Sequence, residues 1–188
     1  MQSDLKNTLS HGRQWRHYEQ HRDGARSYSL AVLVWGPAPS NSIEYRKRCE
    51  IRDALKQDGH DAAFSEDLIG PDPISADPLD EELLQADAAD LIVVLYGSRG
   101  TQTEIDVLLG YPRFADKSLI FIHDQMYENV RGSVAKGLWA KLGKYADVVK
   151  YTTEQMEACE VVARAHDKAE LYRRAAYIDA VKEKAGRL

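Results

Sequence analysis

The chain has 188 residues, of which 44% are hydrophobic and 29% charged, and this length and composition suit one sizeable α/β domain. Its 25 basic and 30 acidic side chains leave a net charge of −5, so we expect no general polyanion-binding surface and no nucleic-acid partner. No apolar run approaches the ~20 residues needed to span a bilayer, and the first residues lack the apolar stretch of a signal peptide. The sequence therefore predicts a cytoplasmic protein with no membrane partner.

Residues 1–29 are polar and rich in Arg and His, and we expect them to form a flexible arm or a surface helix that packs on a partner subunit. His17 and His21 stand four residues apart, which is a metal-ligand spacing, but no acidic residue or cysteine occupies a matching position. The two cysteines, Cys49 and Cys159, are too few for a disulfide framework, and we predict that they are buried free thiols. No metal site is expected.

The first half of the core, which begins at Leu30, alternates strand and helix signals. A continuously apolar run is typical of a strand buried on both faces, and sequences rich in Gly, Pro and Asp mark the turns between elements. In chain order we predict a strand at 30–35, a turn at 36–40, a helix from Ser42 to Asp58-Gly59, a short strand at 60–64 and a stiff, proline-rich loop at 70–78.

The second half continues this alternation. In chain order it predicts a helix at 80–88, a strand at 91–96, a helix from Thr101 that is interrupted near Pro112, strands at 118–122 and 147–151, and a helix at 153–184. Alternating apolar strands and helices imply right-handed crossovers and a parallel sheet. We therefore expect an α/β, Rossmann-like or flavodoxin-like three-layer sandwich over residues 30–188, as a single domain. Its sheet would be five-stranded and mainly parallel, with helices on both faces and a long C-terminal helix.

Ligands of an open parallel sheet bind beyond the carboxyl ends of the strands, near the switch in strand order. Glycine, hydroxyl and carboxylate residues converge in the segments that follow the predicted strands. These segments are Trp35-Gly36-Pro37, Glu66-Asp67, residues 96–104 and His123-Asp124. We therefore place the candidate site at this edge.

Residues 97–104, Gly-Ser-Arg-Gly-Thr-Gln-Thr-Glu, form the most informative of these segments. Its glycines allow backbone N–H groups to approach a ligand closely, and the following helix start presents unpaired N–H groups to an anion. Ser98 is placed to donate to a phosphate or a sugar hydroxyl, and the helix dipole would hold Glu104 ionised, as a carboxylate nucleophile requires. Alternatively, Thr101 and Glu104 form a capping box in which Glu104 accepts from the Thr101 backbone N–H. Both interpretations remain open.

At this segment the chain resembles the nucleoside 2-deoxyribosyltransferase-like superfamily, which includes nucleoside deoxyribosyltransferases and nucleotide N-glycosidases. The resemblance covers residues 30–125. Deoxyribosyltransferases typically read Asp-Ser-Gly-Thr-x-x-Glu here, and Gly100, Thr101 and Glu104 match that pattern, whereas Ser98 and Arg99 depart from it. With these two residues the segment is similar to that of the 5′-monophosphate N-hydrolase branch, which reads Ser-x-Gly-x-x-x-Glu. The serine of that branch touches phosphate.

The resemblance implies an N-glycosidase that cleaves the base–sugar bond of a nucleoside 5′-monophosphate or a related nucleotide, without a metal or redox cofactor. Glu104 would attack or electrostatically support an oxocarbenium-like C1′, and a second carboxylate would protonate the leaving base. Asp67, Asp80 and Glu82 are candidates for that second carboxylate, and the role requires a raised pKa. Asp80 and Glu82 are alternatively ordinary solvated charges at a helix N-terminus.

The substrate-binding residues are expected around the first and third strand ends. Trp35 and Tyr96 would stack on the base, or else pack in the core. The full expected set is Trp35, Gly36, Pro37, Ser40, Arg46, Asp67, Tyr96, Ser98, Gly100 and Thr101. The resemblance also implies a homodimer or larger homo-oligomer, because enzymes of this family commonly borrow site residues from a neighbouring subunit. The stripe of the C-terminal helix that includes Met156 and Tyr172 would serve as core or as dimer contact.

Two other functions remain open. The first is that of a Toll/interleukin-receptor-type NAD glycohydrolase, whose Ser-x5-Glu-like segment resembles Ser98 and Glu104, and whose acidic loop resembles Phe64-Ser65-Glu66-Asp67. It would perform the same class of cleavage on NAD, and short proteins of either kind also serve as effectors in bacterial anti-phage systems. The second is a nucleotide-sensing domain that holds a phosphate on the same Gly-rich turn without catalysis.

Overall fold

The fold is a five-stranded, all-parallel sheet with the strand order β2-β1-β3-β4-β5. The computed structural model describes residues 15–16, 18–70, 78–97, 101, 105, 108, 110–131 and 143–186. The strands are β1 (Ala31–Trp35), β2 (Asp61–Phe64), β3 (Leu91–Tyr96), β4 (Ser118–His123) and β5 (Asp147–Tyr151). The α/β class and the parallel sheet are confirmed, and the strand order is that of flavodoxin-like folds.

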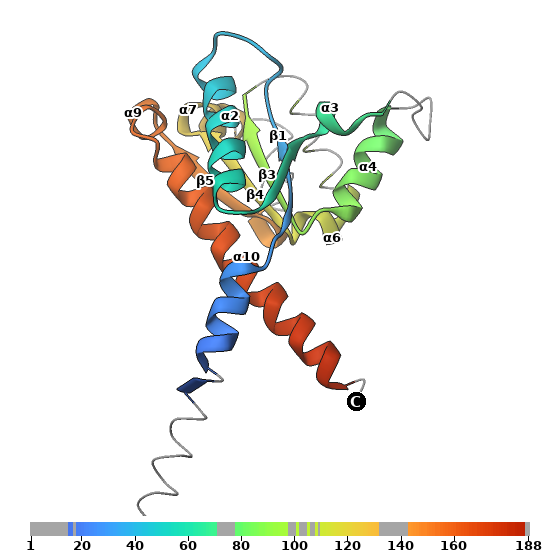
Figure 1. Ribbon diagram of the computed structural model, residues 1–188. Coiled ribbons are helices and arrows are strands. Elements are labelled where there is room, and N and C mark those ends of the chain that lie inside the picture. Colours follow the sequence, from blue (N-terminus) through green and yellow to red (C-terminus); the bar gives the residue numbers. More distant parts are fainter. Residues whose placement is uncertain are drawn as a thin grey trace, which may run out of the picture.

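Helices cover both faces of the sheet (Figure 1). One face packs against α2 (Ile43–Gln57), α9 (Thr153–Glu157) and α10 (Glu160–Gly186), and the other against α4 (Pro78–Ala88) and α6 (Pro112–Ala115). Two short helices, α3 (Ser65–Leu68) and α7 (Asp124–Arg131), follow β2 and β4 directly. The structure is therefore a three-layer sandwich.

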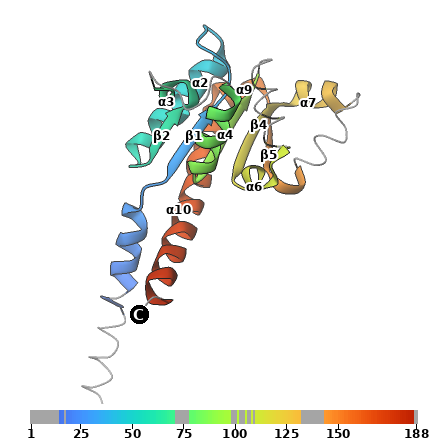
Figure 2. The same ribbon diagram turned by 90° about the vertical axis from the view of Figure 1, so that its right-hand side faces the viewer.

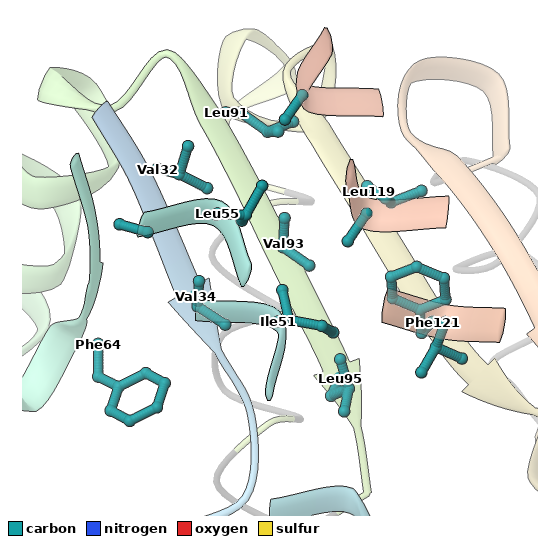
Figure 3. Packing of buried hydrophobic residues seen from close by; sticks show 14 of the residues in the cluster. Val32, Val34, Ile51, Leu55, Phe64, Leu91, Val93, Leu95, Leu119 and Phe121 are labelled. Atoms are coloured by element: carbon teal, nitrogen blue, oxygen red, sulfur yellow. The ribbon is translucent and has the colours of Figure 1, made fainter. Parts of the chain in front are cut away.

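The central strands are apolar along their whole length because both of their faces are covered. All six residues of β3 are buried. On the α2 side, alternate strand residues such as Val34 and Val93 pack against Ile51 and Leu55 of α2 (Figure 3). Burial of this kind stabilises a fold by roughly 25 cal/mol per Å² of apolar surface, so the buried strands set the sheet register and hold their carboxyl ends at one edge.

Helix α2 has the limits expected from its sequence. Ser42 is its N-cap, and the Ser42 Oγ accepts a hydrogen bond from the Tyr45 N–H at 3.1 Å. The helix ends at Asp58, and Gly59 follows with φ +84°, a conformation that glycine adopts without steric cost. Local sequence signals thus determined both ends of this element.

The C-terminal helix expected at 153–184 is two helices, α9 and α10, and this prediction of one continuous helix was wrong. Thr152 and Gln155 form a capping box that starts α9, and the chain breaks at Cys159, whose φ is +62°. Because it lies in this turn, Cys159 is exposed rather than buried, and Cys49 is half-buried. The expectation of two buried thiols was therefore also wrong.

Residues 18–27 form a helical segment that lies beside the C-terminal half of α10 (Figures 1 and 2). Arg173 Nη1 donates to the Arg26 carbonyl at 2.9 Å, and the Tyr177 hydroxyl lies 2.9 Å from His21 Nδ1. Of the two possibilities for the N-terminal region, the helix is the one that the described residues adopt. Across the described ranges, no helix combines the length and the apolar character that crossing a membrane would require.

Candidate functional site

The loops after β1 and β3 lie next to each other, because β1 and β3 are neighbours although β2 separates them in the sequence. This is the topological switch point of the sheet. A Cβ on Gly97, just after β3, would lie 3.3 Å from Pro37 Cγ and 3.3 Å from Glu44 Cγ. The β1 loop, the first turn of α2 and the β3 loop therefore meet at one place.

Gly36 allows this close approach. Its φ is +155°, and a Cβ there would lie 3.2 Å from the Leu95 carbonyl oxygen and 3.2 Å from Arg48 Cδ. A side chain at this position would thus meet strand backbone that has little freedom to move. Gly36 and Pro37, expected around a substrate, act in this structure to bring the strand ends together.

Arg48 is the central cation of this edge. Its side chain is buried, and it donates to the carbonyl oxygens of Val34 (Nη2, 2.9 Å) and Pro37 (Nη1, 3.1 Å). Its guanidinium also stacks on the Phe64 ring, 4.1 Å from the ring centroid. Arg48 therefore fixes the carboxyl end of β1 and leaves donors for one carboxylate.

Glu66 of α3 is that carboxylate. Arg48 Nη1 and Nη2 donate to Glu66 Oε1 and Oε2, both at 2.7 Å, which is the bidentate geometry of a strong charge-assisted pair. Partial burial of Glu66 opposes its ionisation, but the hydrogen bonds from Arg48, its own backbone and Ser65, together with the Arg48 charge, outweigh burial and lower the pKa of Glu66. Glu66 is thus held as an anion.

Glu82 of α4 has the opposite property. Burial raises the pKa of Glu82, and the negative charge of Glu66 raises it further. The two helices that carry these carboxylates are in contact, since Gln85 Nε2 donates to the Ser65 carbonyl at 3.2 Å. We define Arg48, Glu66 and Glu82 as the edge cluster. In it one carboxylate stays ionised, and its charge helps a second carboxylate to retain its proton to higher pH, a combination that suits acid–base chemistry.

The other end of the same edge holds Tyr151, the last residue of β5. Its hydroxyl is buried and has no hydrogen-bond partner among the described residues. Burial and the charge of Glu44 both raise the pKa of Tyr151, so the phenol stays protonated. The His123 ring packs against it edge-on at 5.4 Å, and His123 Nε2 lies 3.1 Å from Thr153 Oγ1. Polar groups thus line the carboxyl edge from β2 to β5.

Two of the expected site residues, Trp35 and Tyr96, lie in the core and not on a surface that a substrate could contact. Trp35 is fully buried and Tyr96 is 7% exposed, and both pack in the core on the α4 side, so a base could not stack on either ring without rearrangement. The core alternative is the one that their positions support. The buried Trp35 Nε1 has no acceptor among the described residues.

The remaining described candidates are polar residues at the rim. Ser40 Oγ contacts Ser42 Oγ at 3.1 Å, and Arg46 is exposed on α2. Asp67 is exposed and lies 3.7 Å from Arg52, and Asp80 is exposed at the start of α4. Among the three candidates for the second carboxylate, Glu82 is the one that joins the edge cluster and has a raised pKa.

The residues of the Gly-rich segment fall largely outside the described part of the chain. Ser98, Gly100 and Glu104 are not described, so their expected roles remain predictions. Thr101 is helical and fully buried, and Ile105 and Leu108 are buried in the core on the α4 side. The expected helix after β3 is therefore supported at these positions.

Sequence reasoning missed Arg48, and it placed Glu66 at the strand ends without giving it a partner or a role. Arg48 stands at i, i+3 and i+7 spacing with Ile51 and Leu55, so a cation lies on the apolar face of the predicted helix. A buried cation needs a carboxylate partner, and this pattern was the signal that could have indicated one. Which carboxylate it would be depended on the arrangement of α2 and α3 in space.

Comparison with known proteins adds no assignment. Neither protein-family models nor curated protein sequences match the chain. No group of three or more His, Cys, Asp or Glu side chains suited to a metal ion occurs within the described ranges. The geometry of the edge cluster is therefore the basis for a functional proposal.

Proposed function

We propose that this protein is an N-glycosidase that cleaves the base–sugar bond of a nucleoside 5′-monophosphate or a related nucleotide. The observation that carries the proposal is the pair Glu66 and Glu82 at the carboxyl edge of the sheet, with pKa values shifted in opposite directions. N-glycosidic cleavage requires a proton for the departing base and an anionic environment for the oxocarbenium-like sugar. At this edge Glu82 would supply the proton, and we assign the anionic group at the sugar to Glu104.

In the proposed mechanism Glu82 is the general acid that protonates the leaving base. Glu66 is a positioning residue: burial raises the pKa of Glu82, the Glu66 charge raises it further, and Arg48 holds the Glu66 carboxylate in place. The carboxylate at C1′ is assigned to Glu104 on the strength of the family resemblance, with Ser98 and the following helix start holding the phosphate. Water, or a second base, then accepts the sugar.

The proposal is tested by incubating the protein with nucleoside monophosphates, nucleosides and NAD, and measuring released base or nicotinamide by chromatography. We expect base release from a monophosphate, and a 10²- to 10⁴-fold lower rate in Glu82→Gln and in Glu104→Gln. Glu81→Gln, which makes the same chemical change one residue away on α4, is the matched control and should retain the rate. Full activity in both the Glu82 and the Glu104 variants would refute the mechanism.

A second candidate is NAD glycohydrolysis at the same site. The observation that favours it is the place of Glu66 in the edge cluster, because the acidic segment after β2, like Ser98 and Glu104, resembles a segment of Toll/interleukin-receptor-type enzymes. Nicotinamide release from NAD in the same assay would support it. Nucleotide binding without any base release, unchanged in Glu104→Gln, would instead indicate a nucleotide-sensing domain.

A further inference from the structure

A large groove lies far from the edge cluster, between residues 18–27 and the C-terminal half of α10. It encloses about 630 Å³, a size common among binding cavities of proteins. Its apolar lining includes Tyr18, Tyr177, Ile178 and Val181. Tyr18 is 57% exposed and Ile178 is 50% exposed. We call it the helix-pair groove.

The helix-pair groove is basic in a protein whose net charge is −5. Its lining contains three arginines and a lysine but a single carboxylate, that of Glu170, which pairs with Arg173 at 3.0 Å. Two of the cations, Arg22 and Lys182, also have exposed carboxylate neighbours just outside the groove. Arg26 and Arg174 have no carboxylate partner in the described part of the chain, so they remain available to an acidic partner.

Helix α4 presents a surface of the opposite charge. Its sequence, PLDEELLQADA, contains four acidic residues and no basic one, and the Asp87 carboxylate makes an exposed ion pair with Arg113 at 3.1 Å. Asp80, Leu84, Asp87 and Ala88 recur at helical spacing and are exposed, so they form one outward face, with the 48% exposed Leu84 side chain between carboxylates. Leu68 of α3 lies beside Leu84, because both line a second cavity of about 300 Å³. We call these residues the α4 face.

These two surfaces contain much of the apolar area that the described residues leave uncovered. Of the ten large hydrophobic side chains exposed among the described residues, Leu68, Ile69, Leu79 and Leu84 belong to or adjoin the α4 face, and Tyr18 and Ile178 lie on the two helices of the groove. An exposed apolar patch rimmed by charge is typical of a protein-interaction surface. The two patches have opposite charge, and one is a helix face whereas the other is a groove.

The two surfaces lie apart on the molecule. Figure 1 places the helix pair below the sheet and α4 beside it, and the same separation is visible in Figure 2. They therefore cannot meet within one copy of the chain. A contact between different surfaces of identical copies is heterologous, and it builds rings or open chains rather than a closed two-fold dimer.

We infer that the helix-pair groove binds the α4 face of a second copy of this chain, so that the protein assembles head to tail. Leu84 enters the apolar groove between the two helices, and Asp80 and Asp87 pair with Arg26 and Arg174. Asp87 exchanges its weak, exposed pair with Arg113 for a pair across the contact. The arrangement is a helix-in-groove contact of the kind that an amphipathic helix makes with an apolar cleft. The inference does not depend on the proposed enzymatic activity, and it names the surfaces through which subunits associate.

The first test measures the mass of the purified full chain by light scattering and sedimentation across a concentration series. We expect a ladder of species beyond the dimer, which shifts toward the monomer as salt rises from 0.05 to 0.5 M because screening weakens exposed charge pairs. A monomer at every concentration up to about 1 mM would overturn the inference, and so would a dimer that grows no further.

The second test exchanges the charges. The double variant Arg26→Glu with Arg174→Glu should weaken self-association by ~30-fold or more, because like charges then face each other. The double variant Asp80→Lys with Asp87→Lys should weaken it to the same extent for the same reason. Mixing the two variants restores opposite charges at every contact, so assembly should return. The control pair, Arg46→Glu with Arg164→Glu, makes the same change in net charge at exposed arginines outside both surfaces.

Each outcome is decisive. The head-to-tail contact is contradicted if the two reversals leave association unchanged. It is also contradicted if mixing fails to restore association while both variants keep the circular dichroism spectrum and thermal midpoint of the wild type. If one reversal prevents folding, the self-association of Leu84→Ser is compared with that of the wild type instead. Removing the exposed leucine should weaken association without touching the core.

Discussion

Arg48 of α2 and Glu66 of α3 form a bidentate ion pair in which both N–O distances are 2.7 Å. The guanidinium is almost fully buried, whereas the carboxylate is 43% exposed. Because Arg48 also donates to the Val34 and Pro37 carbonyls, one side chain joins the end of β1 to two helices. The pair therefore acts first on the fold of the candidate site and, through the charge of Glu66, on Glu82.

Replacing Arg48 with Met should lower the free energy of unfolding by about 3 kcal/mol, because two buried carbonyls and one carboxylate lose their donor. The midpoint of urea denaturation measures this loss. Arg46→Met is the matched control, since Arg46 is exposed on the same helix and its loss should change the free energy of unfolding by no more than about 0.5 kcal/mol. Equal stability of the two variants would show that the ion pair contributes nothing to the fold.

The raised pKa of Glu82 predicts a pH-dependent effect of Glu82→Gln. In the folded protein Glu82 holds its proton to a higher pH than in the unfolded chain, so the wild type loses stability as pH rises through the folded pKa. The glutamine variant lacks this loss, and it should therefore gain stability over the wild type between pH 5 and pH 8. Denaturation at both pH values measures the gain.

Glu66→Gln separates the two causes of that shift. Removing the Glu66 charge should lower the pKa of Glu82, which carbon NMR of the side-chain carboxyl reports directly. Asp67→Asn, at the exposed neighbouring position on α3, is the control. A Glu82 titration that is the same in all three proteins would mean that Glu66 does not tune it.

The fold could be predicted from the sequence to the extent that local signals determine it. Leu91 to Tyr96 is continuously apolar because β3 is buried on both faces, and Ser42 and Gly59 marked the ends of α2 because a cap and a positive φ have specific residue preferences. The break at Cys159 had no such signal, since a cysteine rarely adopts φ +62° and its conformation depends on packing between α9 and α10.

The candidate site was less predictable because its chemistry arises from contacts between elements. The sequence placed Glu66 and Glu82 near the carboxyl edge. The charge of Glu66 raises the pKa of Glu82 because α3 and α4 lie together in space, and residues 69–77 separate these two helices in the sequence. Trp35 could have been a stacking residue or a core residue, and its side chain alone could not decide between these. Its full burial in the core on the α4 side makes it a core residue.

His60 predicts acid sensitivity of the fold. Burial lowers its pKa, and the charge of Arg173 lowers it further, although Glu170 and Asp58 partly oppose this. The Leu30 N–H donates to Nδ1 at 3.2 Å and the Arg173 guanidinium lies 2.7 Å from Nε2, so donors face the ring on both sides. The folded state therefore favours neutral imidazole.

The sign of the pH effect follows. Above pH 6.5 His60 is neutral in both states, and below it the unfolded chain takes up the proton first, so stability falls toward the lower folded pKa with a slope of at most ~1.4 kcal/mol per pH unit. His60→Asn keeps an acceptor for Leu30 and should flatten this slope between pH 6.5 and 5. Parallel slopes in the two proteins would assign the acid sensitivity to other groups.

The two cysteines should differ in reactivity. Cys159 is exposed in the α9–α10 turn, with Lys47 Nζ 2.9 Å from its sulfur, whereas Cys49 is half-buried on α2. Access of a reagent limits thiol modification, so N-ethylmaleimide should label Cys159 first. Peptide mass spectrometry of a time course gives the order, and Cys159→Ser should slow the first phase. Earlier labelling of Cys49 would contradict the exposed turn.

Gly24 predicts how tightly residues 18–27 hold to α10. A Cβ at Gly24 would lie 2.6 Å from the Tyr177 hydroxyl, so Gly24→Ala must displace the ring that also contacts His21 and Tyr28. Alanine favours a helix over glycine by about 1 kcal/mol, yet this local gain does not relieve the steric overlap. We expect the backbone amides of residues 18–27 to exchange hydrogen faster, with little change in the exchange of β3. Gly70→Ala, where a Cβ meets nothing within 4 Å, is the control, and equal protection in both variants would show that Tyr177 yields without loosening the helix pair.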